Sequence, residues 1–583
     1  MELKELRNSI HFSQVEFAEL LGVSIASLRR WEAGETNPSP MAKEKIKYVE
    51  RQIHNGKLEK LIEEKKETAT FVSEVQKQRD FYYCGERHTV QYMPYVYNGP
   101  TDQVDFFNTL ISMQEKKNCS QEWEKYRRKL SIIQLADDVV TEQYLLEKPK
   151  DVAKSWSADV GAHGWHRYVG RFPAQLTRAI INHFDLNEYT TLLDPFCGSG
   201  TALVEARLLG IPAIGIEISP LSAMMSRVKS KFPDDGTQLD EYIQLLQDFY
   251  QQTWDQFLGG REIDGLSYLE IINRHGNAIK AFPNYDKWFS KEALLGISIV
   301  VEFILKIKDV TYPAEFVATA LSAKMRSIGN VDVDVVRAEY RKTPRENVDV
   351  LKLIVSQLKK MRKTITEMNS THKESVRGAD TVNVIEGSCL SADIKPGSIS
   401  AIITSPPYGV ESLSYLRTHL LSFRALEPVL GVDPYNFGAD VIGSEYLDGG
   451  DIDAGSLSVM NKSKTCKEFF VKLTEDENYF SNKKRILMMM KFFEDMYVLA
   501  KKFAIWLKNG GKIAFVIGNK KLGDYIIPTD SIITEIFESC GLRYNGTIAH
   551  KLKTNNSNSK VPWQDRIIEN EFVIFYSKEL GLK

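Results

Sequence analysis

The segment that most constrains the fold is Asp194-Pro-Phe-Cys-Gly-Ser-Gly-Thr201, which directly follows the residues Thr191-Leu-Leu. This pattern is typical of a buried strand that ends in a glycine-rich turn and continues into a helix. A second apolar run, Ile399–Ile403, leads into Ser405-Pro-Pro-Tyr408. In an open α/β sheet, ligands bind outside the carboxyl ends of parallel strands. The two segments therefore predict one site, at the sheet edge where both strands end.

Further strand and helix patterns surround these two segments. Short apolar runs recur at residues 213–218, 382–386, 512–517 and 571–576, and helical patterns lie between them. Alternation of strands and helices predicts an α/β fold with a doubly wound, Rossmann-like sheet. The alternation stops between residues 231 and 380, where helical patterns follow one another, so an inserted helical subdomain is expected there. A second insertion is expected near residues 411–495.

Composition sets broad limits on function. The 75 Lys and Arg residues against 77 Asp and Glu give a net charge of −2. This balance neither requires nor excludes nucleic acid, because local patches and not the total attract phosphates. The six cysteines form no C-x-x-C pair and no Cys/His cluster, so the sequence predicts no metal site and a reducing compartment. The first residues lack the apolar run of a signal peptide, and no apolar stretch is long enough to span a bilayer. We therefore expect a cytoplasmic protein.

The first 50 residues carry the pattern of a small all-α domain. Apolar spacing predicts a helix at Gln14–Leu21, a turn at Gly22–Ser24 and a second helix at Ile25–Glu32. The expected core consists of Phe17, Leu21, Val23, Leu28 and Trp31. The order of residues resembles the phage-repressor-like helix-turn-helix family, whose second helix enters the major groove of DNA. The resemblance implies that one residue, Arg29, contacts phosphate and that the others face base edges: Ser24, Ala26, Ser27 and Arg30. A helical module for protein pairing is the alternative.

The glycine-rich segment has the features of a nucleotide-binding turn. Gly198 and Gly200 lack a side chain, so the backbone can approach a ligand closely and adopt a positive φ. The helix expected from Thr201 points free N–H groups at the same place. Glu217 ends the next strand about 20 residues further on, where an acidic residue can accept hydrogen bonds from ribose hydroxyls. The segment contains neither G-x-G-x-x-G nor Gly-Lys-Ser/Thr, which disfavours a dinucleotide or ATP.

Three motifs together resemble those of the DNA amino-methyltransferases that use S-adenosylmethionine. They are, in chain order, Asp-Pro-Phe-x-Gly-Ser-Gly-Thr, Gly-x-Glu-x-Ser-Pro and Ser-Pro-Pro-Tyr. The resemblance implies that Asp194 and the loop backbone hold the methionine end of this cofactor. It also implies that Glu217 binds the ribose and that Ile218 packs on the adenine ring. Ser388 stands where the family commonly has an aspartate that contacts the adenine amine. The full set of expected cofactor-binding residues is Asp194, Pro195, Phe196, Cys197, Gly198, Ser199, Gly200, Thr201, Glu217, Ile218, Ser388, Phe172 and Pro173.

The Ser405–Tyr408 segment fits a reaction at an exocyclic amine. The amine nitrogen of cytosine or adenine is a poor nucleophile, because its lone pair is delocalised into the ring. The hydroxyl of Ser405 and the carbonyl of Pro406 can each accept an amine hydrogen and turn the nitrogen toward tetrahedral geometry. Pro406 and Pro407 stiffen the loop, so little reorganisation is needed. Tyr408 offers a face on which a base that has left the duplex can stack.

Several alternatives stay open at this point. Serine before Pro-Pro-Tyr resembles the cytosine-N4 branch, so cytosine N4 is the expected target and adenine N6 the alternative. No Pro-Cys dipeptide occurs, which argues against methylation of cytosine C5. An RNA guanine-N2 methyltransferase and a regulator with an inactive domain are further alternatives. The expected partners are double-stranded DNA and a separate restriction endonuclease, in a restriction-modification or defence system. Asn519 and Asp524, after a predicted strand, either line the base pocket or cap a turn.

The chain length of 583 residues predicts about two to four domains. We expect a helix-turn-helix domain at 1–50 and a helical linker of unknown role at 51–150. The cofactor-binding part is expected at 151–230 and the catalytic part at 381–583. The helical insertion between them, 231–380, is a candidate for target recognition, as is the second insertion. The basic residues of the 231–380 insertion fit either phosphate contacts or a solvated helix face. They are Lys324, Arg326, Arg337, Arg341, Lys342 and Arg345.

Overall fold

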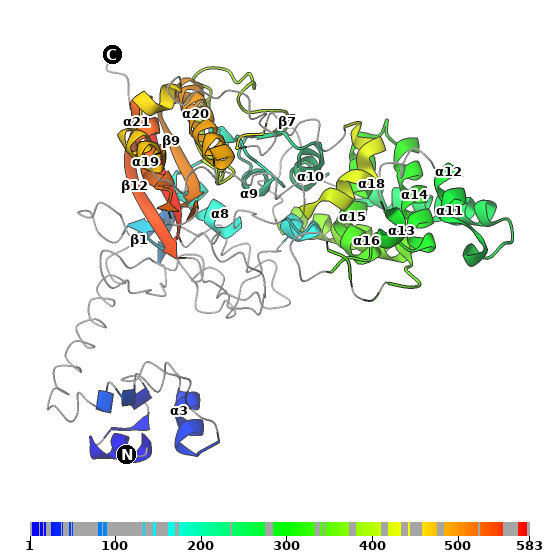
Figure 1. Ribbon diagram of the computed structural model, residues 1–583. Coiled ribbons are helices and arrows are strands. Elements are labelled where there is room, and N and C mark those ends of the chain that lie inside the picture. The colour runs from blue at the N-terminus through cyan, green and yellow to red at the C-terminus, as the bar shows by residue number, and fades with distance from the viewer. Residues whose placement is uncertain are drawn as a thin grey trace. The chain divides into compact units, whose positions relative to one another are not determined.

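The structure is a computed structural model, and the chain divides into two compact units, Met1–Val96 and Tyr97–Lys583 (Figure 1). The N-terminal part is described at residues 3–10, 12–14, 17–18, 25–35, 38, 46–47, 49–50, 80–83 and 86–89. The remainder is described at residues 132–134, 144–146, 161–168, 174–233, 236–274, 284–332, 339–341, 343, 345–371, 381–409, 418–432, 441–443, 457–474, 483–519, 521–522, 525–551 and 570–579.

The N-terminal unit contains the helices α1 (Leu3–Ser9) and α3 (Ile25–Glu32). A small core lies between them and includes Leu6, Phe17, Ala18, Leu28 and Val49. Arg7 ties the two helices together, because its Nε lies 2.7 Å from Glu32 Oε1. Phe17 and Leu28 are buried as predicted, whereas Trp31 is half-buried. Leu21 and Val23 lie outside the described residues.

Seven strands form the sheet of the larger unit, in the order β12-β13-β9-β8-β5-β6-β7. Their bounds are β5 Leu192–Asp194, β6 Ala213–Glu217, β7 Val382–Glu386, β8 Ile399–Thr404, β9 Leu507–Gly518, β12 Leu542–Lys551 and β13 Asn570–Lys578. β13 runs antiparallel to β12 and β9, which flank it, and the other neighbouring pairs of this sheet are parallel. The chain proceeds from β5 outward to β6 and β7, and then returns to β8 on the other side of β5. The boundary between β5 and β8 is therefore the switch point at which doubly wound sheets bind ligands.

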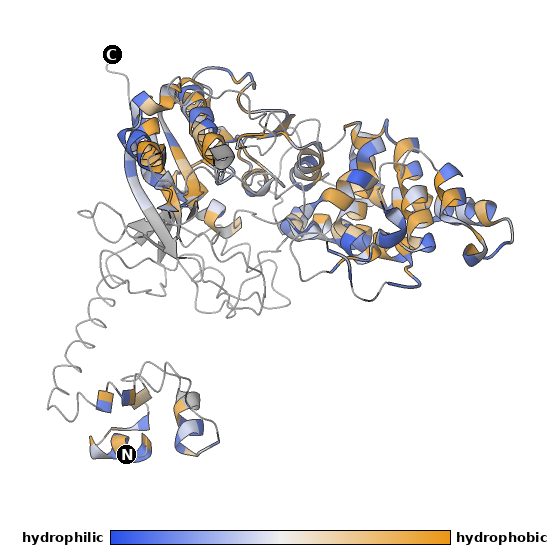
Figure 2. Cartoon of the chain, viewed as in Figure 1, coloured by the Kyte–Doolittle hydropathy of each residue, from blue (hydrophilic) through white to orange (hydrophobic). Residues whose placement is uncertain are grey.

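Helices cover both faces of this sheet. α8 (Ala174–His183) and α9 (Thr201–Leu208) pack on one face. α19 (Lys464–Thr474), α20 (Lys483–Trp506) and α21 (Thr529–Ser539) pack on the other. Neighbouring residues of a strand point to opposite faces, so Leu192 contributes to the first core and Leu193 to the second. β5 and β8, at the centre of the sheet, are therefore buried along their whole length. The helices, in contrast, carry both orange and blue residues in Figure 2.

A separate helical core follows β6 in the chain. α10 (Pro220–Ser230) packs against β6 and β7 and also against α15, so it joins the sheet to the helices (Figure 1). The other members are η2 (Ile263–Gly265), α11 (Thr237–Leu258), α12 (Tyr268–Arg274), α13 (Tyr285–Trp288), α14 (Lys291–Lys306), α15 (Thr311–Ile328), α16 (Val350–Thr371) and α18 (Leu420–Leu430). α18 belongs to the second predicted insertion, yet it packs against α14 and α15 of the first. Residues from both insertions thus share one core.

The six predicted strands are all present, and the α/β class is confirmed together with the helical N-terminal domain. β12 was not predicted, because Leu542–Lys551 lacks regular alternation and shifts register between Tyr544 and Gly546. Between residues 51 and 150 the described residues form short strands, and the remainder of the predicted linker lies outside the described residues. The strands are β1 (Asp80–Tyr83) paired with β2 (Glu86–Thr89), and β3 (Ile132–Gln134) paired with β4 (Tyr144–Leu146). None of the described helices is long and apolar enough to cross a membrane.

Candidate active site

The two predicted loops lie side by side, because the strands that carry them are neighbours. β5 and β8 pair in parallel, with Leu192 opposite Ala401 and Leu193 opposite Ile402. Both strands therefore end at the same edge of the sheet. There, the hydroxyl of Thr404 donates a hydrogen bond of 2.7 Å to Oδ1 of Asp194. This bond ties the glycine-rich loop to the Ser405–Tyr408 loop.

Two glycines give the first loop its shape. Gly198 has a φ of 52° and Gly200 a φ of 85°, both in the left-handed region that disfavours other residues. A Cβ atom on Gly200 would lie 2.8 Å from Ser226 Oγ, and one on Gly198 would lie 3.3 Å from the ring of Tyr168. Directly after Gly200, α9 begins at Thr201, so the first N–H groups of the helix face the loop. The loop thus combines close backbone approach with free backbone donors.

Glu217 closes the loop from the next strand. Its Oε2 accepts a hydrogen bond of 2.8 Å from the N–H of Gly198, and its Oε1 accepts one of 2.9 Å from the N–H of Ser219. Burial raises the pKa of Glu217 to about 7, against the effect of these N–H groups. Burial likewise raises the pKa of Asp194 to about 7, against the hydrogen bonds from Thr404 and Phe196. Two carboxyl groups with raised pKa values therefore flank the loop.

The end of β7 completes this edge of the sheet. β7 pairs in parallel with β6, and the N–H of Gly387 donates 2.9 Å to the carbonyl of Glu217. Ser388 follows, and its Oγ accepts a hydrogen bond of 3.3 Å from the N–H of Leu390. Ile218 is half-buried and directly follows Glu217 in the chain. The ends of three adjacent strands thus present Asp194, Glu217 and Ser388.

Two polar atoms of the loop region lack partners in the part of the chain that the structure describes. Ser199 is 3% exposed, and its Oγ makes no hydrogen bond. Oδ2 of Asp194 accepts none either, since both bonds to this carboxyl use Oδ1. A buried hydroxyl without a partner is costly unless a ligand supplies one. These atoms fit a ligand that carries both an ammonium or hydroxyl donor and oxygen acceptors, as S-adenosylmethionine does.

The second loop is held rigidly. Ser405 Oγ and the hydroxyl of Tyr408 lie 3.1 Å apart, within hydrogen-bond distance. Pro406 is buried, whereas Ser405, Pro407 and Tyr408 are half-buried. Gly409 ends the loop with a φ of 85°, and a Cβ atom there would lie 2.7 Å from Met489 Sδ. The loop therefore presents hydroxyl, carbonyl and aromatic groups from a backbone with little freedom.

Sequence reasoning missed three residues that support the site. Thr404 joins the loops, and Tyr168 contacts Gly198 as described above. Glu205, fully buried on α9, binds His163 Nε2 through Oε1 and Arg178 Nε through Oε2, each at 2.7 Å. A signal for Glu205 was available, because an acidic residue in the otherwise apolar start of α9 needs a buried partner. His163 is thus a buried packing residue.

The remaining predicted residues divide into three groups. Arg29 and Arg30 are exposed on α3, as DNA contact requires. Ala26 and Ser27 belong to α3, but their side chains are not among those described. Ser24, Phe172, Pro173 and Asp524 lie outside the described residues. Asn519 caps a helix, because it bonds the N–H of Asp530 at 3.1 Å and its carboxylate at 2.8 Å, at the start of α21.

Comparison with known proteins shows which families parts of this chain are similar to. Residues 37–224, which include β5, the glycine-rich loop and β6, match the DNA methylase family of N6 and N4 amino-methyltransferases. Residues 3–42 match the helix-turn-helix family. Both resemblances found in the sequence are thereby confirmed: residues 3–42 are similar to the helix-turn-helix family and residues 37–224 to the DNA methylase family.

Several characterised relatives are similar over most of their length. The Type II methyltransferase M.BsoBI of Geobacillus stearothermophilus is 24% identical over 71% of this chain and 85% of its own. M.MvaI of Kocuria varians is 26% identical over 68% of this chain and 86% of its own. A DNA modification methylase structure from Thermus thermophilus overlaps only 16% of this chain, at 18% identity and a TM-score of 0.13, which is too little to define a fold. S-adenosylmethionine, predicted from the sequence, is the methyl donor of this class of enzyme.

Proposed function

We propose that this protein transfers a methyl group from S-adenosylmethionine to cytosine N4 of a specific sequence in double-stranded DNA. The observation that carries the proposal is the hydrogen bond between Thr404 and Asp194, because it holds the base-binding loop directly beside the cofactor loop. The class of enzyme supports methyl transfer to DNA. The choice of cytosine N4 rests on this chain's own loop, as argued below.

The cofactor loop has a suitable group for each part of the donor. Oδ2 of Asp194 and the Ser199 hydroxyl are available for the methionine end. Each oxygen of Glu217 retains a lone pair for a ribose hydroxyl, and Ile218 and Ser388 stand at the ends of β6 and β7 for the adenine. The donor supplies a methyl group activated by a positively charged sulfur. The protein's part is to hold that end of the pocket closed to water and in fixed orientation.

The second loop prepares the acceptor. When Ser405 donates its proton to the oxygen of Tyr408, its own lone pairs are available for one amine hydrogen. The carbonyl of Pro406 accepts the other, and the amine nitrogen loses its conjugation with the ring. The face of Tyr408 supports the base after it has left the duplex. Because Pro406 and Pro407 fix the backbone, these acceptors are already in place before the reaction.

Serine at position 405 favours cytosine over adenine, in line with the resemblance to the cytosine-N4 branch. Adenine N6 is the second candidate, because the same two acceptors would serve its amine. The N-terminal helix-turn-helix, with Arg29 and Arg30 exposed, supports duplex DNA over RNA.

The biological setting follows from the same argument. A methyltransferase that modifies a specific duplex sequence protects that sequence from a nuclease. We therefore place this protein in a restriction-modification system with a separate endonuclease as its functional partner. The names of the Type II relatives support this setting.

One experiment tests the proposal directly. The full-length protein is incubated with labelled S-adenosylmethionine and unmethylated plasmid DNA, and the nucleosides are then separated by mass spectrometry. We expect N4-methylcytosine. N6-methyladenine would keep the enzyme class and overturn the choice of base. Labelling of RNA but not of DNA would overturn the substrate class.

A further inference from the structure

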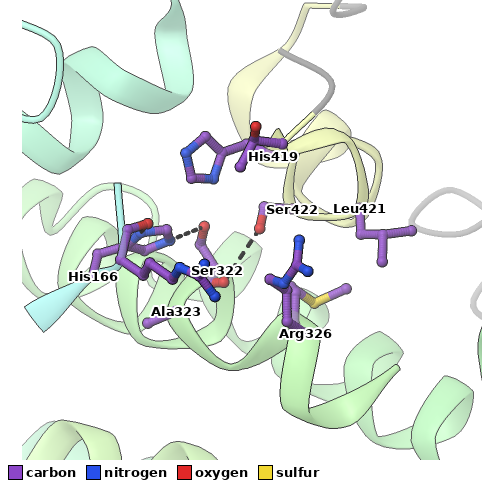
Figure 3. Close-up of a pocket in the computed structure, with 10 residues that line it drawn as sticks. His166, Ser322, Ala323, Arg326, His419, Leu421 and Ser422 are labelled. Carbon is purple, nitrogen blue, oxygen red and sulfur yellow. Dashed lines mark hydrogen bonds between the residues drawn. The ribbon is translucent and has the colours of Figure 1, made fainter. Parts of the chain in front are cut away.

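A small pocket lies beside the active site, among residues that sequence reasoning did not connect. It is formed by α15, by the start of α18 and by the segment that precedes α8 (Figure 3). Its polar lining comprises His166, Arg167, Ser322, Arg326, Thr418, His419 and Ser422. The cavity volume is about 30 Å³. A water molecule needs ~15 Å³ on this measure, so the pocket has room for a small oxyanion but not for a base.

The charge of the pocket is positive. None of its ten described lining residues is acidic, and two of them, Arg167 and Arg326, are arginines. Burial lowers the pKa of His419 to about 4, and the neighbouring charges of Lys229 and Arg326 add to this effect. His419 is therefore neutral at physiological pH, and the arginines supply the charge. Such a site attracts an anion and disfavours a cation.

His419 contributes a buried nitrogen without a hydrogen-bond partner in the described part of the chain. His166 is satisfied, because its Nδ1 lies 2.8 Å from the carbonyl of Arg167 and its Nε2 lies 2.7 Å from Ser322 Oγ. Ser422 Oγ donates 3.2 Å to the carbonyl of Ser322. His419 is 8% exposed, yet its Nε2 has no hydrogen-bond partner among the described residues. Figure 3 shows its ring turned toward the space between His166 and Arg326.

A single aromatic ring separates this pocket from the cofactor loop. The ring of Tyr168 stacks on that of His419, with centroids 5.2 Å apart. The same ring lies 3.3 Å from the Cβ position of Gly198, and its hydroxyl lies 3.3 Å from Ser222 Oγ. A group bound in the pocket would therefore lie one aromatic ring away from the cofactor loop, which the bond between Thr404 and Asp194 joins to the Ser405–Tyr408 loop.

We propose that this pocket binds one phosphate of the DNA backbone next to the extruded nucleotide. The inference rests on the proposed function, since it takes DNA as the substrate. A phosphate offers several acceptors to the guanidinium groups of Arg167 and Arg326 and to an N–H at Nε2 of His419. Its neighbouring nucleotides can remain outside, which the small volume requires. The bound phosphate fixes the strand at a point from which the base rotates into the second loop.

Three variants of the full-length protein test the proposal. His419→Phe keeps the ring that stacks on Tyr168 and removes the nitrogen. Arg326→Gln removes one charge. Arg261→Gln is the matched control, because Arg261 is an exposed arginine of the same helical region, paired with Glu270. The DNA is a duplex that contains the mapped methylation site, and a second duplex carries a neutral methylphosphonate at each flanking phosphate in turn. Circular dichroism and S-adenosylmethionine affinity report whether each variant is folded.

We expect His419→Phe and Arg326→Gln each to raise the KM for DNA by about tenfold, with S-adenosylmethionine affinity and kcat unchanged. Arg326→Gln should also reduce the slope of log affinity against log salt by about one. One methylphosphonate position should weaken the wild type and the control but leave both pocket variants unaffected.

Three results would overturn the proposal. The first is an unchanged KM for DNA in both variants. If the wild type still methylates DNA in that experiment, the proposed function remains valid and only the pocket proposal fails. A raised Kd for S-adenosylmethionine with normal DNA binding would assign the pocket to the cofactor. The third is that inorganic phosphate stabilises the wild type but not the variants, while the KM for DNA is the same in all of them. This result would show that the pocket binds a free anion. A wild type without any DNA methylation would remove the proposed function itself.

Discussion

The sheet edge and the pocket beside it are built in different ways. At the sheet edge, the functional groups lie in two continuous segments, 194–201 and 405–408, and much of the contribution comes from the backbone. The pocket collects His166, Arg326 and His419 from three elements that are far apart in the chain. A site of the first kind leaves a motif in the sequence, because turns and strand ends demand particular residues in order. A site of the second kind exists only after the helices have packed.

The largest expected effect separates chemistry from binding at the sheet edge. Ser405→Ala removes one of the two acceptors for the amine, and we expect methyl transfer to fall by about 10²–10³-fold. Binding of S-adenosylmethionine, measured by calorimetry, should be nearly normal, because Ser405 belongs to the other loop. Ser398→Ala, at the opposite end of β8, is the control. Loss of cofactor binding in Ser405→Ala would show that the two loops do not have separate roles.

The glycine loop offers a test of how far the backbone itself makes the site. Gly200→Ala places a methyl group 2.8 Å from Ser226 Oγ at a φ of 85°. Gly259→Ala, at a φ of 55°, meets nothing within 4 Å. The unfolding free energy of the control should decrease by only about 1–2 kcal/mol, because alanine disfavours a left-handed backbone. Gly200→Ala should lose more, and also cofactor affinity. Equal losses in thermal unfolding would mean that close approach at Gly200 is unimportant.

A smaller effect should follow from loosening the bond between the loops. Thr404→Val keeps the shape of the side chain but leaves Asp194 Oδ1 without its 2.7 Å partner. We expect a loss of about 1–3 kcal/mol in unfolding free energy, together with reduced methyl transfer. Thr404→Ser retains the hydroxyl and should stay close to the wild type. If the serine variant is as impaired as the valine variant, packing and not the hydrogen bond joins the loops.

These contrasts also explain what could be predicted from the sequence. The strands next to the site were predicted because they are short apolar runs, and the loops because glycine and proline stand at fixed positions. β12 was missed, since Gly546 interrupts its pattern. The sharing of one core by α14, α15 and α18 could not be predicted, because apolar helix faces do not specify their partners. The same limit hid His419: a histidine ahead of α18 carries no sign that Tyr168 will stack on it.

A further prediction is a pH dependence located at Asp194. Burial raises the pKa of this carboxyl to about 7 in the folded protein, against ~3.9 in an unfolded chain. The unfolded chain therefore releases this proton first, and stability is lost as the pH rises from about 4 through 7. Asp194→Asn cannot ionise, so its melting temperature relative to the wild type should increase between pH 5 and pH 8, both without ligand. The comparison of the two proteins cancels the opposite contribution of His419, whose lowered pKa favours the folded state as the pH rises toward 6.5. A constant difference across this range would mean that Asp194 is ionised in the folded protein throughout, and that its second oxygen already has a proton donor.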